Sequence, residues 1–188
     1  NTPEVAEEIL ASGQADMVSM ARPFLADPDF VAKAAAGKAH TINTCIGCNQ
    51  ACLDHTFGGK ITSCLVNPRA CHETLMVATP APSKERIAVV GAGPAGLAFS
   101  TEAAKRGYEV TLFDAANEIG GQFNVAKQVP GKEEFFETLR YFGTQIDATG
   151  VKLQLGKKVS AQDLTAAGFK QVVLATGVTP RTPAIDGI

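Results

Sequence analysis

The sequence predicts an α/β protein in which a cysteine-rich segment joins two α/β parts. Residues 3–36 show a helical pattern, a short apolar run and a second helical pattern, which is typical of one α/β unit. Residues 40–83 have little periodicity and hold all five cysteines. From residue 86 an apolar run leads directly into a glycine-rich turn, which indicates a doubly wound, Rossmann-like domain.

The first part begins with a helix that Thr2 can cap and Gly13 can end. A short buried strand is expected at residues 16–20, and a second helix at residues 28–36. Arg22 lies in the loop between them. A lone arginine after a strand is more often a surface charge than a ligand. Barrel enzymes nevertheless place phosphate contacts at the carboxyl ends of their strands. Arg22 is therefore a candidate contact to a phosphate group.

Four cysteines have the spacing of iron–sulfur ligands. Two, three and eleven residues separate Cys45, Cys48, Cys52 and Cys64 in turn, so three thiols share one short turn and the fourth follows a loop. Iron–sulfur clusters are held by four thiolates, commonly from a compact run plus a distal cysteine. We therefore predict a [4Fe-4S] cluster, whose bonds would order a segment that has little apolar periodicity.

Other uses of these thiols remain open. Structural zinc usually has two separated CxxC pairs, and the second pair is missing here. Disulfides suit oxidising compartments, and nothing in the sequence resembles a signal peptide. Cys71 is left over, and a small buried or half-exposed side chain is its expected role.

The third part carries the motif Gly91-Ala92-Gly93-Pro94-Ala95-Gly96 between a predicted strand, residues 86–90, and a predicted helix that ends at Gly107. In this context the first glycine permits the tight turn, the second lets a pyrophosphate approach the backbone, and the third lets the helix pack on the strand. Free N–H groups and the helix dipole favour phosphates there. Pro94 and Ala95 begin the helix and are candidate contacts to the pyrophosphate of the dinucleotide.

An acidic residue follows the next predicted strand, residues 109–113. Asp114 matches the carboxylate that accepts hydrogen bonds from an adenosine ribose, which favours FAD or NAD over NADP at this site. Two later turns favour FAD and supply further candidate cofactor-binding residues. These candidates are Gly121 and Gln122, just past the acid, and Ala175, Thr176 and Gly177, at the end of a predicted strand that begins at residue 172.

A predicted helix and a short strand fill the interval between these turns. Residues 132–148 place Phe135, Leu139, Phe142 and Ile146 at helical spacing, which predicts a helix with one apolar face in the core. Residues 152–155 are expected to form a strand. These elements would complete the alternation of helix and strand.

Composition excludes several functions. The 188 residues carry a formal net charge of -2, so no polycationic surface for nucleic acid is expected. No apolar run has the length of a membrane span. We expect a soluble, cytoplasmic protein without nucleic-acid or membrane partners. The chain lacks an initial methionine and both ends cut into patterned segments, so we interpret it as an internal piece of a longer enzyme.

These motifs together resemble the flavin and iron–sulfur branch of the old yellow enzyme family, in particular the bacterial NADPH-dependent 2,4-dienoyl-CoA reductases. The resemblance covers the whole chain and is most specific at residues 16–28, 45–52, 91–96 and 120–122. It implies that residues 1–38 end an FMN-binding (β/α)8 barrel, with Ala21 and Arg22 at the FMN phosphate. It further implies an iron–sulfur segment and linker at residues 39–83 and part of a FAD domain at residues 84–188.

The resemblance also implies an activity. Such an enzyme takes electrons from NADPH through FAD, the [4Fe-4S] cluster and FMN to an acyl-CoA in unsaturated fatty acid β-oxidation. An enoate reductase or an NADH oxidase of the same architecture would share these motifs. An amine dehydrogenase is an alternative of similar architecture, but that group places two residues between the second and third cysteines, where this chain has three. A zinc module beside a nucleotide-binding domain is a further alternative. The acid-donating tyrosine and histidine would lie before Asn1 and the NADPH site beyond Ile188. The chain by itself is therefore expected to be inactive.

Overall fold

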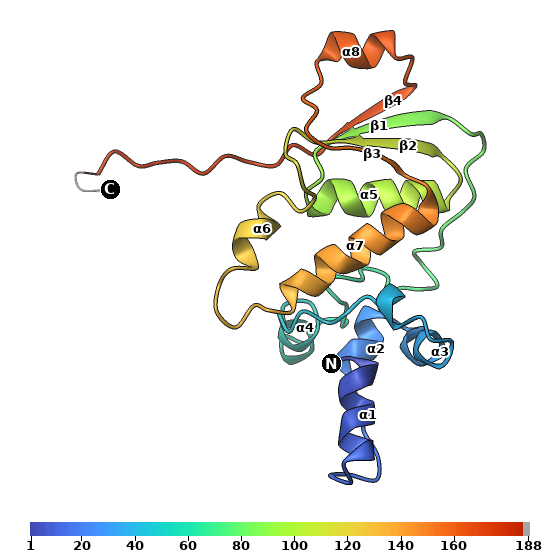
Figure 1. The fold of residues 1–188 in the computed structure, drawn as a ribbon, viewed down its shortest axis with the longest axis vertical. Helices are drawn as coiled ribbons and strands as arrows, with labels where there is room; N and C mark the ends of the chain where they lie inside the picture. Colours follow the sequence, from blue (N-terminus) through green and yellow to red (C-terminus); the bar gives the residue numbers. More distant parts are fainter. Residues whose placement is uncertain (186–188) are drawn as a thin grey trace.

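Four parallel strands form one sheet in the computed structural model, which describes residues 1–185 (Figure 1). The last three residues of the expected 84–188 domain lie outside the described residues. The sheet order is β3-β2-β1-β4, and all three strand pairs are parallel. This order is that of a Rossmann half-sheet. The strands are β1 (Arg86–Val90), β2 (Glu109–Phe113), β3 (Lys152–Gln154) and β4 (Gln171–Leu174).

Helices cover both faces of this sheet, as expected for a doubly wound fold. On one face α5 (Pro94–Lys105) and α7 (Phe135–Thr149) pack against β1 and β2. On the other face α8 (Ala161–Ala166) places Leu164 against Ala88 and Phe113. The larger core cluster holds Ile87, Val89, Ala92, Leu97, Ala103, Val110, Leu112, Ile146 and Val151.

Local sequence explains where these elements begin and end. Gly93, in extended backbone, caps α5, and Pro94 occupies its first turn, where its missing N–H costs nothing. Gly150 ends α7 with a φ of 72°, a conformation that side-chain-bearing residues rarely adopt. A capping box between Ser160 and Asp163 starts α8. The predicted helix 132–148 and strand 152–155 are therefore confirmed as α7 and β3 within a few residues.

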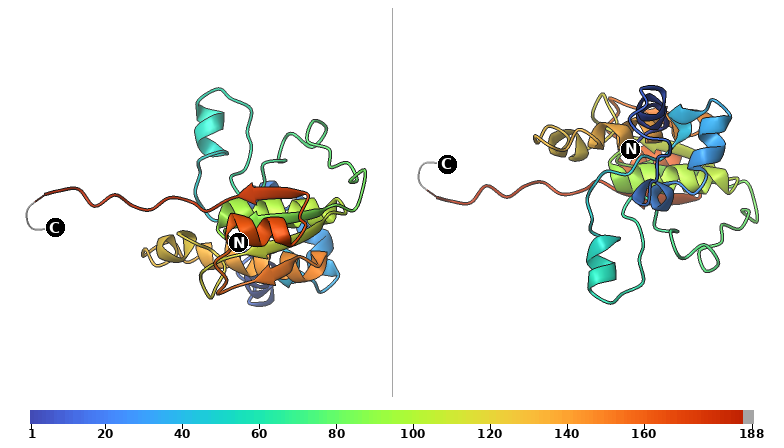
Figure 2. Two further views of the ribbon diagram at one scale, coloured as in Figure 1. Left: turned by 90° about the horizontal axis from the view of Figure 1, so that it is seen from above. Right: turned by 90° about the horizontal axis from the view of Figure 1, so that it is seen from below.

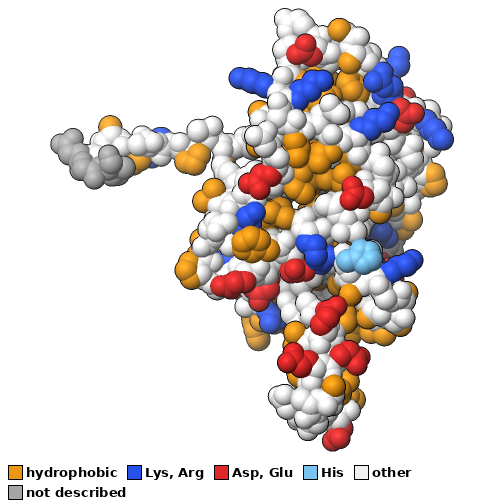
Figure 3. Space-filling model, viewed as in Figure 1, with side chains coloured by type: hydrophobic (Ala, Val, Ile, Leu, Met, Phe, Trp, Pro, Cys, Tyr) orange, Lys and Arg blue, Asp and Glu red, His pale blue; other side chains and the backbone are white. Residues whose placement is uncertain are grey.

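The first 83 residues form short helices joined by loops at one end of the domain. Figure 1 shows α1 projecting away from the sheet, and Figure 2 shows the loop that carries α4 extending to one side. Acidic side chains gather on α1 (Figure 3). A short helix, α6, lies later in the chain, before α7. The bounds are α1 (Pro3–Ala11), α2 (Arg22–Ala26), α3 (Phe30–Ala35), η1 (Ala39–Thr41), α4 (Leu53–Phe57) and α6 (Phe123–Ala126).

The expected strand at residues 16–20 was wrong. These residues are irregular, and the Met17 side chain is 79% exposed. A strand is stabilised by hydrogen bonds to a neighbour, and the strands described in residues 1–185 all pair within β1 to β4. The segment that was expected to be a loop instead forms α2, and the expected helix 28–36 is α3. The first 38 residues, which were expected to end a (β/α)8 barrel, thus contain helices and no β-strand.

No helix within residues 1–185 is long and apolar enough to cross a membrane.

Candidate functional site: a glycine-rich loop and a thiol-lined cavity

The glycine-rich loop leaves no room for side chains at two of its three glycines. A Cβ on Gly91 would lie 2.2 Å from the Ala175 carbonyl oxygen, and Gly91 has a φ of 109°. A Cβ on Gly96 would lie 1.8 Å from the Gly91 carbonyl oxygen. The Ala175 N–H donates to the Val90 carbonyl at 2.8 Å, so the end of β4 is fixed beside the loop. The structure therefore brings Ala175, predicted from sequence, against the glycine motif.

The second glycine faces open space. A Cβ on Gly93 would meet no atom within 4 Å, although Gly93 directly precedes α5. The N–H groups in the first turn of a helix have no intrahelical acceptors, and they lie at the positive end of the helix dipole. An open approach to this turn is the arrangement that binds phosphate groups. Ala95 and Gly96 are the residues of that turn that follow Pro94.

A second turn packs on the first. The Gly120 N–H donates to the Ala92 carbonyl at 2.7 Å, and a Cβ on Gly121 would lie only 3.2 Å from the Gly93 Cα. The Gln122 side-chain amide donates to the Val178 carbonyl, just past Thr176 and Gly177. The predicted candidates after β2 and after β4 thus meet at the same edge of the sheet, where strand carboxyl ends place a cofactor.

Asp114 has a structural contact that the motif did not reveal. One carboxylate oxygen accepts the Ala92 N–H at 2.6 Å, and the other accepts the Ala116 N–H at 2.8 Å. The carboxylate therefore holds the glycine loop in place at the end of β2. Each carboxylate oxygen can accept more than one hydrogen bond, so Asp114 can brace the loop and still accept ribose hydroxyls.

The four predicted ligand cysteines line one small cavity. Cys45, Cys48, Cys52 and Cys64 surround it together with Arg22 and Asn49. The Ser63 N–H donates to the Ala51 carbonyl at 2.7 Å, which closes the loop that brings the distal cysteine back to the first three. Cys71, in contrast, is exposed.

Backbone N–H groups point at the sulfur atoms. The Gly47 N–H donates to Cys45 Sγ at 3.5 Å. Burial raises the pKa of the Cys64 thiol, while hydrogen bonds from the backbone of Val66 and Asn67 lower it and the nearby Cys45 and Cys48 raise it. The pKa of Cys64 is raised overall, so the backbone donors offset only part of the effect of burial.

Four thiols around one cavity are a donor set that suits either an iron–sulfur cluster or a structural zinc ion. Within residues 1–185 no group of three or more His, Cys, Asp or Glu side chains is arranged so that it could hold a metal ion. Structural zinc needs four ligands around one ion at about 2.3 Å from sulfur. The structure thus gathers the four thiols, and the preference for a cluster over zinc rests on the spacing of the cysteines in the sequence.

Arg22 connects the thiol cavity to its neighbour. Ala21 and Arg22 line a second cavity together with Cys45 and Gly47, and Arg22 also lines the thiol cavity. Its guanidinium donates to the Asn49 side chain, inside the cysteine loop. Asn49 has a φ of 61°, which asparagine tolerates better than most residues. The residues expected at an FMN phosphate therefore lie directly beside the first cysteine.

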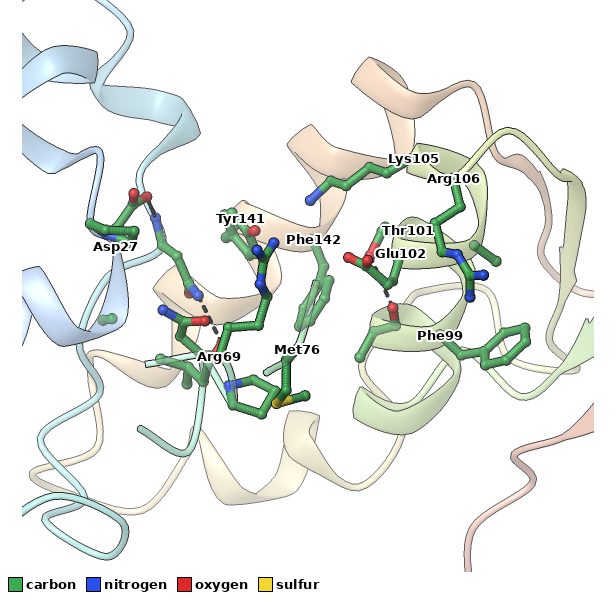
Figure 4. Close-up of a pocket in the computed structure, with 18 of the residues that line it drawn as sticks. Asp27, Arg69, Met76, Phe99, Thr101, Glu102, Lys105, Arg106, Tyr141 and Phe142 are labelled. Carbon is green, nitrogen blue, oxygen red and sulfur yellow. Dashed lines mark hydrogen bonds between the residues drawn. The ribbon is translucent and has the colours of Figure 1, made fainter. Parts of the chain in front are cut away.

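A third and larger cavity, of about 830 Å³, lies between the short helices and the sheet domain. Arg69, Lys105, Tyr141 and Phe142 line it (Figure 4). Burial raises the pKa of Tyr141 to about 12, and burial also lowers the pKa of Lys105. No sequence motif pointed to this cavity, because its lining comes from residues scattered between 26 and 171.

Known families match both parts of the chain. Residues 85–188 match the pyridine nucleotide-disulphide oxidoreductase family, and residues 1–41 match the NADH:flavin oxidoreductase / NADH oxidase family. Together these matches place the two parts of the chain in families of flavin-dependent oxidoreductases. The chain belongs to the pyridine nucleotide-disulphide oxidoreductase family through its sheet domain.

Individual relatives align with nearly all of the chain. It is 42% identical to a metal reductase of Desulforamulus reducens over 98% of the chain and 28% of that protein, and 37% identical to an NADH oxidase of Thermoanaerobacter brockii over 98% and 29%. A solved 2-naphthoyl-CoA reductase in complex with 2-naphthoyl-CoA superposes with a TM-score of 0.95 and 38% identity, covering 100% of the chain and 29% of that structure. The chain thus spans less than a third of the length of these relatives.

Proposed function

We propose that this chain is the cofactor-connecting section of an iron–sulfur flavoprotein that reduces 2,4-dienoyl-CoA with NADPH in the β-oxidation of unsaturated fatty acids. The overall reaction would consume one NADPH and one proton for each conjugated diene reduced. Residues 1–38 would end an FMN barrel, residues 39–83 would hold the cluster, and residues 84–188 would belong to the FAD domain. We place the protein in the cytoplasm, with acyl-CoA as its small-molecule substrate.

One observation carries this proposal. Arg22 lines both the thiol cavity and the cavity that contains Ala21, so the four cysteines stand beside the residues expected at FMN. The same short segment is joined to the sheet domain that carries the glycine-rich loop. A cluster at the thiols would therefore lie between two flavin sites, which is the arrangement that an electron path requires.

The residues supply binding and orientation. The first turn of α5 would hold the FAD pyrophosphate, Asp114 would accept the adenosine ribose, and Arg22 would contact the FMN phosphate. The cysteines would ligate the cluster. When bound, the two flavins would supply hydride chemistry and the cluster would supply single-electron transfer between them. The close packing at Gly91 and Gly96 holds the glycine loop against the end of β4 and the start of α5.

One relative supports a CoA thioester as the substrate, whereas other relatives act on different electron acceptors or donors. The 2-naphthoyl-CoA reductase that superposes on the whole chain acts, by its name, on a CoA thioester. Other relatives include a metal reductase and an NADH oxidase, so an enoate reductase, an NADH oxidase or an amine dehydrogenase of the same architecture is the alternative. A zinc module beside a nucleotide-binding domain is the remaining alternative, and the metal content of the protein distinguishes it from the cluster.

Substrate assays on the whole protein test the proposal. We expect anaerobic NADPH oxidation to be fastest with a 2,4-dienoyl-CoA, slower with NADH as donor, and absent with the same diene as a free acid. The 188-residue chain alone should give no turnover. Oxidation of NADPH by oxygen or by an enoate, with no response to dienoyl-CoA, would instead assign the protein to the alternative.

A further inference from the structure

We propose that Arg140, supported by Glu137, is a positioning residue that fixes the cysteine loop to the sheet domain and so sets the environment of the cluster and its electron exchange with FAD. This inference rests on the proposed function. It concerns a residue on α7, outside the glycine loop and outside the cysteine motif.

The Arg140 guanidinium uses all three of its nitrogen atoms. Its Nε donates to Glu137 Oε2 at 2.6 Å on the same helix. Its Nη1 donates to the His40 carbonyl, and its Nη2 donates to the Ile42 carbonyl at 2.7 Å and to Thr44 Oγ1 at 3.2 Å. One side chain thus binds three positions of a segment that lies about a hundred residues earlier in the sequence.

The segment that Arg140 holds leads directly into the first cysteine. Ile42 is 2% exposed, Thr44 3% and Cys45 9%, so this stretch is buried although it contains no regular strand. Its backbone carbonyls need partners, because a buried polar group without a hydrogen bond is costly. Arg140 supplies the partner of the buried Ile42 carbonyl. It also donates to the carbonyl of the exposed His40, to which Thr144 Oγ1 adds a hydrogen bond at 3.3 Å.

The helix that carries Arg140 is itself fixed to the FAD side of the molecule. Ile146 of α7 belongs to the core cluster that includes Leu97 of α5, and Leu139 and Phe142 pack against that cluster. The first turn of α5 is the phosphate-binding turn. A continuous connection therefore runs from the glycine loop through α5 and α7 to Arg140, and from Arg140 to Thr44, the residue before Cys45.

Arginine is suited to this task and lysine is not. The planar guanidinium presents several donors in a fixed fork, whereas an ammonium group is a single flexible point charge. Lysine at position 140 would keep the positive charge and some of the stem packing, yet it cannot serve three acceptors and Glu137 with the same geometry. The Arg140→Lys variant therefore separates loop position from charge.

The test uses the whole protein, loaded with its cofactors and kept anaerobic. We compare wild type, Arg140→Lys and Glu137→Gln with a matched control, Arg106→Lys. Arg106 also ties the sheet domain to an earlier segment, through hydrogen bonds to Thr79, but Thr79 lies in the linker beyond the cysteines. The measurements are iron content, rate of FAD reduction by NADPH, rate of the subsequent cluster reduction, and the reduction potential and electron paramagnetic resonance spectrum of the cluster.

We expect Arg140→Lys to keep its iron and its rate of FAD reduction, while cluster reduction slows by about tenfold or more, because a small misplacement of a reacting group has large kinetic cost. The cluster spectrum and potential should shift, and Glu137→Gln should show the same changes more weakly. Arg106→Lys should match wild type. Amide hydrogen exchange of residues 39–47 should be faster in Arg140→Lys than in the control. This measurement reports how well the cysteine loop is ordered, independently of electron transfer.

Two outcomes would overturn the inference, and they are distinct. Iron-loaded Arg140→Lys with wild-type cluster reduction, potential and spectrum would show that the contact does not position the cluster, while the proposed function would stand. Wild-type protein that binds FAD and lacks iron and sulfide would refute the electron path of the proposed function, and the inference with it.

Discussion

Cys48→Ala is expected to lose nearly all of the iron and acid-labile sulfide of the protein, whereas Cys71→Ala is expected to keep them. Cys48 lines the thiol cavity with three other cysteines, and a cluster deprived of one of four thiolates is poorly held. Segment 45–64 should also become more sensitive to protease, because metal ligation supplies folding free energy to a region with a small apolar core. Elemental analysis of the two variants, purified without oxygen, makes the measurement.

Cys71 is a matched control because it changes the same side chain in the same segment. It is exposed and has a φ of 62°, which alanine tolerates about as poorly as cysteine, so the substitution changes little but the thiol. Equal iron in the Cys48 and Cys71 variants would contradict the assignment of the four cavity cysteines.

Gly96→Ala is expected to lower the free energy of unfolding by about 1–3 kcal/mol, the usual cost of overpacking, and to weaken FAD binding. The added Cβ would lie 1.8 Å from the Gly91 carbonyl oxygen, which is backbone and cannot rotate away. Either α5 or the glycine loop must shift. The gain in helix propensity, about 1 kcal/mol, offsets only part of that cost.

Gly143→Ala is the control for this prediction, because Gly143 also lies inside a helix. A Cβ there would meet no atom within 4 Å, so the variant should be about 0.5–1 kcal/mol more stable and should bind FAD as wild type does. Urea unfolding and titration with FAD report both quantities. Equal stability and equal FAD affinity of the two variants would refute the claim that Gly96 is needed for close packing of helix and loop.

The sheet domain could be predicted from sequence because its signals are local. The apolar run at residues 86–90, the glycines that follow and the acid at position 114 are adjacent in the chain, and each predicts its own structure. The start of α8 carries an equally local signal, the capping box between Ser160 and Asp163. That signal could have revealed α8, which our reading of the sequence missed.

Two features could not be predicted, for different physical reasons. The strand expected at residues 16–20 failed because a strand depends on a neighbour that the local pattern does not specify. The contact of Arg140 with residues 40–44 joins positions about a hundred residues apart, and helix periodicity indicates only that its side chain is on the surface of α7. Asp114 was predicted only in part. The motif predicted its place, while its bond to the Ala92 N–H became visible only in three dimensions.

The central claim is that the four cavity cysteines hold a cluster between two flavin sites. Its most direct test is the metal and acid-labile sulfide content of the chain purified without oxygen. The account predicts about four irons per chain with matching sulfide. Zinc in place of iron, or a folded chain that binds FAD and contains neither iron nor sulfide, would contradict it.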